Sequence, residues 1–522
     1  MARQPIPVID LFAGPGGLAE GFSAATNADN RRAFRIALSI EKDAVAHQTL
    51  QLRSFVRSFA GQIPDCYYDC IRGKISKEEL FKTPGFRENV RNAQREAWHL
   101  TLGPETHSAV SRRVGEELKG HDTWVLIGGP PCQAYSLMGR SRMRSQDVEA
   151  FEKDERHFLY REYLRIIAEH APAVFIMENV KGLLSSTIAE KLIFSQILED
   201  LQRPNGGSLR YSVVPLSSTA NLFNTDPRDF ILRSELLGIP QARHRVILCG
   251  VRQDLIGSPR PLSEQPAISV RDAIADLPSL RGGLSKTEDS PEQWMLALLQ
   301  GAQLAEREAD SELADVVSEM FVAARNSRQH TSRGGHFVAT RKANGGRREV
   351  SKRFFEWIHD PKLDGVTGHE ARRHMRSDLY RYLFASSYAM VNGVSPKLDD
   401  FPSPLLPKHK SARPKKGRYA FADRFRVQLW GEPATTVTSH ISKDGHYFIH
   451  PDPSQGRSLT VREAARLQTF PDNYHFEGNR TQQFHQVGNA VPPLLARQIA
   501  MSVAQFLSAA TGSASKNGNR AA

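Results

Sequence analysis

The sequence contains few cysteines and no long apolar run. Its 522 residues include only four cysteines, Cys66, Cys70, Cys132 and Cys249. No second Cys/His pair completes a familiar zinc spacing around Cys66 and Cys70, so we expect reduced thiols rather than a disulfide framework or a structural metal. No apolar run approaches the roughly 20 residues that a helix needs to span a bilayer, and we therefore expect no membrane segment.

The N-terminal region also lacks the pattern of a secreted protein. Residues 1–12, MARQPIPVIDLF, enter an apolar strand pattern without the apolar region and cleavage site of a signal peptide. We therefore expect an intracellular protein.

Acidic residues are outnumbered by basic ones. Lys and Arg total 69 against 57 Asp and Glu, which gives a formal net charge of +12. An excess of this size predicts a polyanionic partner, nucleic acid first, unless it only reflects a diffusely basic surface.

Strand and helix patterns alternate up to about residue 255, which predicts an open, mainly parallel α/β sheet. The segments expected as strands are 7–12, 34–43, 123–129, 173–180, 211–216 and 243–251. The segments expected as helices are 18–25, 44–55, 155–172 and 188–202. Residues 57–121 are less regular, and we interpret them as an insertion around one helix–strand unit.

Strand signals become sparse after residue 255, and arginines are scattered over residues 256–430. This region contains the basic clusters RKANGGRREVSKR and KHKSARPKKGR. Residues 369–384, HEARRHMRSDLYRYLF, predict either a basic helix that contacts nucleic acid or an ordinary amphipathic helix. Helical periodicity returns in SLTVREAARLQTF, and a last helix begins at residue 492.

One cysteine follows two glycines and two prolines at the end of an apolar strand pattern. In LIGGPPCQAYS, Gly128 and Gly129 end the strand, and Pro130 and Pro131 stiffen the turn before Cys132. A packing cysteine does not need this frame, whereas a nucleophile held at a fixed angle does. These residues alone leave both interpretations of Cys132 open.

A glycine-rich turn lies between the first predicted strand and helix. In DLFAGPGGLAEGF, Gly14, Gly16 and Ala19 match the loose G-x-G-x-x-G/A pattern, in which the backbone closely approaches a ligand. No Gly-Lys-Ser/Thr follows, so the turn is not a P-loop, but NAD, FAD and S-adenosylmethionine all remain open. Glu41, at the end of the second strand, is either a ribose ligand or a solvated carboxylate.

Two further segments place polar side chains at strand ends. In IMENV, Glu178 and Asn179 end an apolar strand, where a carboxylate points into the ligand crevice of an α/β sheet. Such a charge is costly unless it is used, which favours a function for Glu178. In IPQARHRVILCG, Gln241, Arg243 and Arg245 alternate and would share one face, aimed at an anion or a base edge unless they form a solvated strand edge.

Together these segments resemble the DNA (cytosine-5)-methyltransferases. The resemblance rests on DLFAGPGG, GGPPCQAYS, ENV, QARHR, LTVREAARLQTFPD and QVGNAVPP, in the family's order, over residues 6–250 and 430–505. It implies an α/β fold with a Rossmann-like S-adenosylmethionine-dependent methyltransferase sheet and an inserted DNA target-recognition domain. The implied parts are a catalytic domain over 1–255, the recognition domain over 256–430, the closing part of the catalytic domain over 431–507, and a disordered tail over 508–522.

The resemblance implies a covalent mechanism. Cys132 would add to C6 of a flipped-out cytosine, so that C5 becomes nucleophilic towards the methyl group of S-adenosylmethionine. Glu178 would hold the N3/N4 edge of the base. Arg245, together with Arg243, would contact O2 and the neighbouring phosphates. No metal is implied.

The resemblance also implies ligand contacts. The cofactor would lie against Phe12, Gly14, Gly16, Gly17, Glu41 and Asn489. DNA would be contacted by Gln133, Ser136, Arg140, Arg142, Lys415 and Lys416, with Arg140 and Arg142 on a mobile loop. The family's acidic residue after the third strand, which holds the adenine amino group, cannot be placed because of the insertion at 57–121.

The implied partners are duplex DNA and a cognate restriction endonuclease that acts on the same site. We expect a monomer in a bacterial cytoplasm, associated with the nucleoid. An RNA cytosine methyltransferase is the nearest alternative, although residues 256–430 are a large region for an enzyme that reads no duplex. A dinucleotide-dependent oxidoreductase would leave Pro-Pro-Cys and Glu-Asn-Val unexplained, and a non-catalytic DNA-binding protein would not need Cys132 and Glu178. The sequence does not disclose the recognition site.

Overall fold

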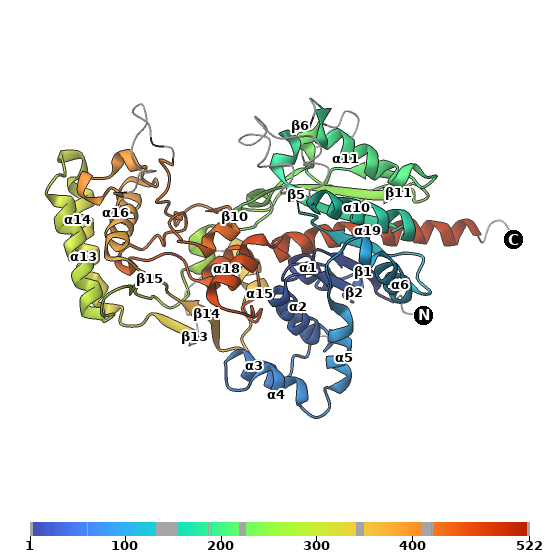
Figure 1. Cartoon of the computed structure of the whole chain (residues 1–522), viewed down its shortest axis with the longest axis horizontal. Coiled ribbons are helices and arrows are strands. Elements are labelled where there is room, and N and C mark those ends of the chain that lie inside the picture. Colours follow the sequence, from blue (N-terminus) through green and yellow to red (C-terminus); the bar gives the residue numbers. More distant parts are fainter. Residues whose placement is uncertain are drawn as a thin grey trace.

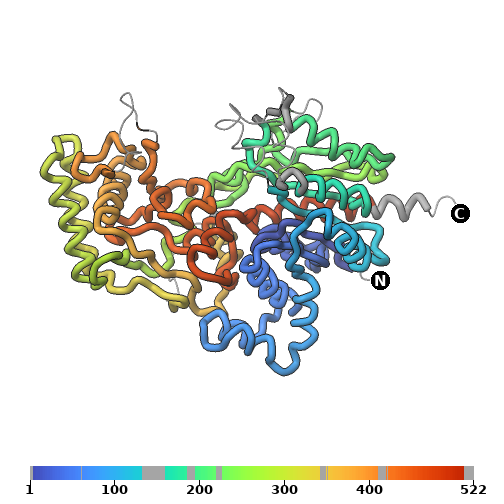
Figure 2. Tube along the Cα trace, viewed as in Figure 1, coloured from blue at the N-terminus to red at the C-terminus, as the bar shows by residue number. Residues whose placement is uncertain are grey.

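The computed structural model describes two lobes that meet along the C-terminal part of the chain (Figures 1 and 2). The described residues are 4–59, 61–131, 155–185, 187–188, 191–218, 226–340, 349–408, 419 and 421–518. No described helix combines the length and apolarity that crossing a bilayer requires.

An eight-stranded mixed sheet forms the centre of the first lobe. Its order is β3-β2-β1-β4-β5-β11-β8, and β9 also pairs with β11. The five strands from β3 to β5 run parallel, whereas β11 is antiparallel to β5, β8 and β9. The bounds are Ile6–Leu11 (β1), Phe34–Glu41 (β2), Ala97–His99 (β3), Val125–Gly128 (β4), Val174–Val180 (β5), Tyr211–Val214 (β8), Ile231–Arg233 (β9) and His244–Arg252 (β11). The α/β prediction is confirmed.

Each face of this sheet is covered by an apolar core. Successive residues of β1 alternate between the two cores, since Val8 belongs to one and Ile9 to the other. Because both faces are covered, β4 is apolar at consecutive positions, which explains the continuous run WVLI. The first face is covered by α1 (Gly17–Ser23) and α19 (Pro493–Gly518), and the second by α6 (His107–Leu118), α10 (Glu155–His170) and α11 (Ile193–Gln202).

The segment after β2 forms a helical projection that reaches the second lobe. Its own apolar core includes Phe55 and Tyr67, and it is completed by Leu363, with Phe337 packed against it. Both of these last residues belong to the second lobe, so the insertion joins the two lobes. Its helices are α2 (Ala44–Arg57), α3 (Asp65–Ile71), α4 (Lys77–Lys82) and α5 (Arg87–Glu96).

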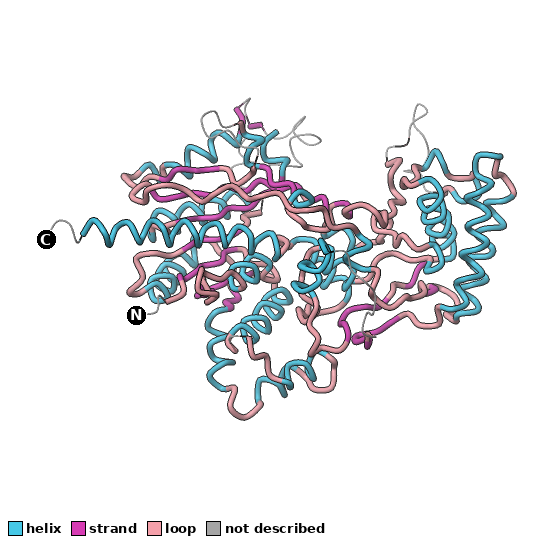
Figure 3. Tube along the Cα trace, turned by 180° about the vertical axis from the view of Figure 1, so that it is seen from behind, coloured by secondary structure: helices cyan, strands magenta, loops and turns pink. Residues whose placement is uncertain are grey.

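The second lobe has a helical outer part and an inner part with little regular structure (Figure 3). The outer part consists of α13 (Pro291–Glu306), α14 (Ala314–Asn326) and α16 (Arg376–Asn392). The inner part contains α12 (Val270–Ile274), β12 (Gly283–Leu284), β13 (Gly334–Ala339), α15 (Glu349–Ile358), β14 (Gly365–Glu370), β15 (Arg373–His374), β16 (Ala434–Thr435), α17 (Val461–Leu467) and α18 (Arg480–Asn489). Short pairs elsewhere are β6 (Thr187–Ile188) with β7 (Lys191–Leu192), and β10 (Gln241–Ala242) with β16.

Three expected segments differ from the structure. The helix expected over 188–202 begins only at Ile193, because β6 (Thr187–Ile188) and β7 (Lys191–Leu192) form an antiparallel pair before it. The helix expected from residue 369 begins at Arg376, since His369 is held in β14 by strand pairing. The expected disordered tail is helical up to Gly518, where α19 ends, and residues 519–522 lie outside the described part. In the first two cases tertiary pairing overrides local helix propensity.

Candidate active site

The glycine turn after β1 is held by the carboxylate of Glu41. The backbone N–H of Gly14 donates to Oε2 at 2.7 Å, and that of Asp43 donates to Oε1 at 2.7 Å. β1 and β2 are parallel neighbours, so their carboxyl ends meet at one edge of the sheet. Each carboxylate oxygen can accept a further hydrogen bond from a ligand.

The conformation of this turn leaves room beside Gly14. Phe12, Gly14 and Gly16 have φ angles of 57°, 56° and 93°, in the left-handed region. A Cβ added to Gly14 would meet no described atom within 4 Å, whereas one added to Gly16 would lie 2.8 Å from Leu50 Cδ1. Gly14 therefore faces open space, while Gly16 is required by close packing as well as by its backbone conformation.

Gly17 allows the C-terminal segment to approach the same turn. A Cβ at Gly17 would lie 2.2 Å from the carbonyl oxygen of Val491, and one at Gly21 would lie 2.4 Å from Ala496 Cβ. This packing accounts for glycine at position 17, and its expected contact with the cofactor stays a prediction. Val491 is two residues past Asn489, whose exposed side chain ends α18, so QVGNAVPP lies against the glycine turn.

Tyr474 also holds the turn, a role that the sequence motifs did not predict. Its hydroxyl donates to the carbonyl of Pro15, and its ring lies under the guanidinium of Arg53, 4.8 Å from the ring centroid. Tyr474 follows the segment LTVREAARLQTFPD by two positions. No local pattern relates it to a turn near the N-terminus.

The end of β5 contacts the turn that precedes Cys132. A Cβ added to Gly129 would lie 2.9 Å from Glu178 Oε2, so glycine is the residue that lets this carboxylate lie against the backbone. Asn179 Nδ2 donates to the carbonyl of Pro130 at 3.3 Å. The two predicted segments GGPPC and ENV are thus in direct contact, because β4 and β5 are parallel neighbours.

Arg245 reaches the same carboxylate from the antiparallel strand β11. Its Nε lies 2.8 Å from Glu178 Oε1, and the two side chains remain 13% and 15% exposed. The register that sets Arg245 opposite Val180 brings the arginine to the carboxyl edge of β5. A carboxylate and a guanidinium therefore lie together at this edge of the sheet, and each keeps part of its surface exposed.

Arg243 does not share this exposed position. It is 2% exposed, and its guanidinium donates to the carbonyls of Val437 at 2.7 Å and Gly488 at 3.3 Å. Burial, with the charge of Arg245, lowers the pKa of Arg243 to about 9. The expected alternation fails because the chain leaves strand pairing between β10 and β11 at Arg243. The geometry therefore does not support the expected contact of Arg243 with the base or phosphates.

Seven of the predicted side chains cannot be compared with the structure. Cys132 directly follows Pro131, the last residue described in that turn. The residues that lie outside the described part are Cys132, Gln133, Ser136, Arg140, Arg142, Lys415 and Lys416.

The third parallel strand ends in a histidine. His99 is the register partner of Glu41, and its ring lies 5.2 Å from that of His47. Residues 100–104, LTLGP, contain no carboxylate, and the first acidic residue after β3 is the exposed Glu105. The acidic residue expected after the third strand is thus not found directly at the strand end.

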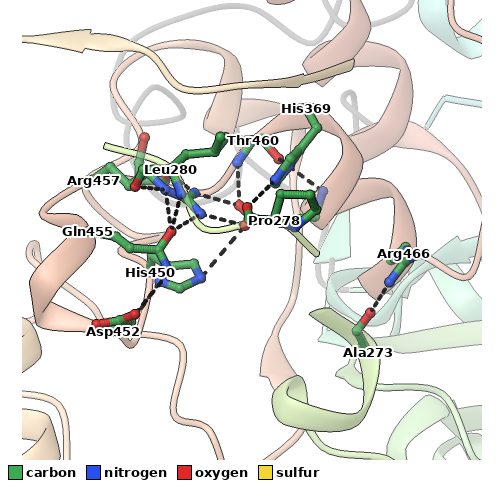
Figure 4. A network of polar contacts seen from close by, with 12 residues as sticks. Ala273, Pro278, Leu280, His369, His450, Asp452, Gln455, Arg457, Thr460 and Arg466 are labelled. Carbon is green, nitrogen blue, oxygen red and sulfur yellow. Dashed lines mark hydrogen bonds and ion pairs between the residues drawn. The ribbon is translucent and has the colours of Figure 1, made fainter. Parts of the chain in front are cut away.

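The segment around α17 holds the inner second lobe through buried polar contacts (Figure 4). Arg457 donates to both carboxylate oxygens of Glu463 at 2.8 and 2.7 Å, and His369 contacts Thr460 and the carbonyl of Pro278. We name this group the α17 network: Pro278, Leu280, His369, His450, Asp452, Gln455, Arg457, Thr460 and Glu463.

Comparison with known proteins agrees with this arrangement. The model of the C-5 cytosine-specific DNA methylase family matches residues 102–505. The type II methyltransferase M.Bpa9945I of Bacillus paralicheniformis is 33% identical over 518 residues, which cover 95% of this chain and 98% of that protein. The type II methyltransferase M.AgeI of Thalassovita gelatinovora is 27% identical, with coverage of 95% and 98%.

A solved structure supports the same fold. A protein of E. coli described as a DNA modification methyltransferase encoded within a prophage superposes with a TM-score of 0.50 at 20% identity, over 96% of this chain and 99% of that one. The family model matches most of the chain, and a relative above 30% identity covers nearly all of it. The chain therefore belongs to the C-5 cytosine-specific DNA methylase family.

Proposed function

We propose that this protein transfers a methyl group from S-adenosylmethionine to C5 of cytosine within a specific duplex DNA sequence, through a covalent adduct with Cys132. One observation carries the proposal. Glu178, Arg245 and the Gly129–Pro130 backbone come from three neighbouring strands and meet at one sheet edge, directly before Cys132.

The glycine turn supports S-adenosylmethionine as the methyl donor. Gly14 borders open space, and the Glu41 carboxylate beside it can accept hydrogen bonds from a ribose diol. Bound there, the cofactor supplies an activated methyl group. The residues proposed to hold it are Phe12, Gly14, Gly16, Gly17, Glu41 and Asn489.

The proposed reaction begins with the Cys132 thiolate. Its sulfur forms a bond to C6 of the flipped-out cytosine, and the electron pair of the C5–C6 double bond makes C5 nucleophilic. Glu178 holds N3 and N4 and favours a proton on N3, which stabilises the charge that develops in the ring. After methyl transfer a base removes the C5 proton, and the thiolate leaves C6 as the double bond reforms.

Two arginines are proposed to orient the groups of the site. Arg245, which contacts Glu178, orients that carboxylate and reaches O2 of the base. Arg243 acts as a positioning residue, because its buried guanidinium ties the QARHR segment to the carbonyl of Gly488, next to Asn489.

The substrate is proposed to be a specific duplex site. Two of the relatives named above are type II methyltransferases, and the basic excess of this chain suits a phosphate backbone. Gln133, Ser136, Arg140, Arg142, Lys415 and Lys416 are proposed as DNA contacts, and a cognate endonuclease as the partner whose cutting is blocked.

The covalent mechanism is tested with Cys132→Ser. A hydroxyl is a far weaker nucleophile at neutral pH, so we expect transfer of labelled methyl to duplex DNA to fall by at least about 10³-fold while S-adenosylmethionine binding stays. Cys66→Ser, at a half-buried thiol outside the site, is the matched control. Duplex DNA with 5-fluorocytosine should give a denaturation-resistant adduct with the wild type only.

Activity of the serine variant above a few per cent, or no adduct with the wild type, contradicts the assignment. Acceptance of methyl by tRNA rather than duplex DNA would favour the RNA alternative. Mapping methylated cytosines in cells that express the protein identifies the recognition site.

A further inference from the structure

A polar cavity lies at the opposite edge of the sheet from the glycine turn. It measures about 570 Å³ and is bordered by Pro5, just before β1, and by Phe34, the first residue of β2. Four arginines line it, Arg32, Arg35, Arg57 and Arg95, against two glutamates, Glu96 and Glu117. The proposed reaction uses none of these residues.

Both glutamates of the lining are already paired. Glu96 forms an ion pair with Arg57 Nη2. Glu117 Oε1 lies 2.7 Å from Arg95 Nε and 3.3 Å from Arg113 Nε. The carboxylates are therefore occupied, and the positive charge of the remaining lining is left in excess.

Arg57 retains donors without acceptors. Its side chain is 8% exposed, and its Nε and Nη1 have no hydrogen-bond partner among the described residues. The nearest further acid, Glu20, approaches Nη1 only to 3.8 Å. These two nitrogens are themselves buried, so Arg57 would act on an anion in the cavity through its charge rather than through a direct hydrogen bond.

Arg32 adds a second guanidinium at short range. Its Nη1 donates to the carbonyl of Arg57 at 2.8 Å, which holds it at the cavity. Burial and the charge of Arg57 lower the pKa of Arg32, whereas Glu96 and Glu20 raise the pKa of Arg57, so the two glutamates compensate Arg57 more than Arg32. Arg35 lies three residues after Arg32, near the start of β2, and contributes a third guanidinium, which is exposed.

The donors and the size of the cavity define its ligand. Forked guanidinium groups match the oxygens of phosphate, and the hydroxyl-bearing residues Ser54 and Ser58 also line the cavity. The volume lies within the range of small-molecule sites and exceeds what a lone ion needs. Phe34 and Ile36 form an apolar part of the wall.

We propose that this cavity binds a phosphate group, either free phosphate or the phosphate of a small monoester, through the guanidinium groups of Arg32 and Arg35, with the buried charge of Arg57 behind them. The site is separate from the proposed catalytic crevice, since β1 and β2 run between them. Its measurement requires neither DNA nor S-adenosylmethionine.

The test is calorimetric titration of the full chain at constant ionic strength, with inorganic phosphate, with adenosine 5′-monophosphate, and with chloride as the control anion. We expect saturable binding of the two phosphates by the wild type. Arg32→Gln with Arg35→Gln should weaken it by about tenfold or more, because two charge-assisted contacts are lost. The matched control, Arg31→Gln with Arg112→Gln, removes the same charge at exposed residues outside the cavity.

Tighter binding of the nucleotide that is lost in the Arg32/Arg35 variant identifies a monoester site, and equal binding of the two phosphates identifies a free-phosphate site. The proposal is overturned if chloride competes equally, if neither phosphate gives saturable binding, or if the two double variants bind alike. Methyl transfer by the Arg32/Arg35 variant should match the wild type, so this failure is distinct from failure of the proposed reaction.

Discussion

Two arginine–glutamate pairs of this molecule have similar geometry and different surroundings. Arg245 and Glu178 approach to 2.8 Å with 13% and 15% of their side chains exposed, whereas Arg457 and Glu463 approach to 2.7 Å with 1% and 1% exposed. Glu463 also accepts the backbone N–H of Thr460, so both of its oxygens have partners inside the protein. An ion pair with open surface can still bind a ligand, while a fully buried one can only hold structure.

The buried pair belongs to a region whose paired strands are few and short. Arg462 donates to the carbonyls of Thr367, Pro471 and Tyr474, and Arg466 forms a bidentate pair with Asp472 at 2.9 Å. In the first lobe the backbone ladders fix the strands. In the second lobe, buried guanidinium groups satisfy the carbonyls of loops and thereby fix them.

The functional role of the Arg245–Glu178 pair is tested most directly at Glu178. We expect Glu178→Gln to lower kcat by about 10²–10⁴-fold, the range for a positioned proton donor, because the amide cannot favour the N3 proton. Its free energy of unfolding should change by less than about 1 kcal/mol, since both side chains keep access to solvent, which screens the loss of the charge pair. Single-turnover methylation and urea unfolding measure the two quantities.

Equal loss of stability and activity in Glu178→Gln would mean that the crevice pair is structural. Less than a tenfold loss of kcat would remove Glu178 from the reaction.

The opposite result is expected at Glu463. Glu463→Gln leaves Arg457 buried without its counter-charge, which should lower the free energy of unfolding by about 3–5 kcal/mol. The activity of the molecules that remain folded should stay close to that of the wild type. Urea unfolding followed by tryptophan fluorescence gives the stability, and activity is normalised to the folded fraction.

Glu356→Gln, at an exposed residue of α15, is the matched control for Glu463→Gln and should cost less than about 0.5 kcal/mol. If both variants lose the same stability, burial of the Arg457–Glu463 pair does not cause the loss.

A smaller effect is expected in the pH dependence of the free energy of unfolding. Burial lowers the pKa of His369 to about 4, so the folded protein keeps this residue neutral while the unfolded chain binds its proton near pH 6.5. The stability from neutral His369 is complete above pH 6.5 and is lost as the pH falls towards 4. Between pH 7 and pH 5 the loss is about 2 kcal/mol.

His369→Gln should remove this part of the pH dependence, whatever its stability at pH 7. The measurement is the difference in unfolding free energy between pH 7 and pH 5 for both proteins. Identical differences would show that His369 titrates normally in the folded state.

The sheet and the centre of the crevice could be predicted from the sequence because their signals are local. Apolar runs ending in Gly129, Glu178 or Glu41 mark strands whose carboxyl ends carry the proposed ligand groups, and the structure brings these ends to one edge. The ends of parallel strands meet by topology alone, so no knowledge of distant contacts was needed.

The features that could not be predicted from the sequence depend on contacts between distant segments. Arg243 and Arg245 look alike in sequence, yet one is buried by Val437 and Gly488 while the other keeps part of its surface exposed. Alternation along a strand could not show that the strand pairing breaks between them. The packing role of Gly17 likewise depends on Val491, at the other end of the chain.

The contact between Gly17 and Val491 sets the order of events during synthesis. Roughly 470 residues must leave the ribosome after Gly17 before Val491 can pack on it, which takes about half a minute to a minute and a half at usual elongation rates. A nascent chain therefore carries the glycine turn, Glu41 and Glu178 long before α19 covers α1. The turn proposed to hold the cofactor is therefore packed only after residue 491 has been translated, and a message truncated before that residue yields protein in which the turn lacks this contact.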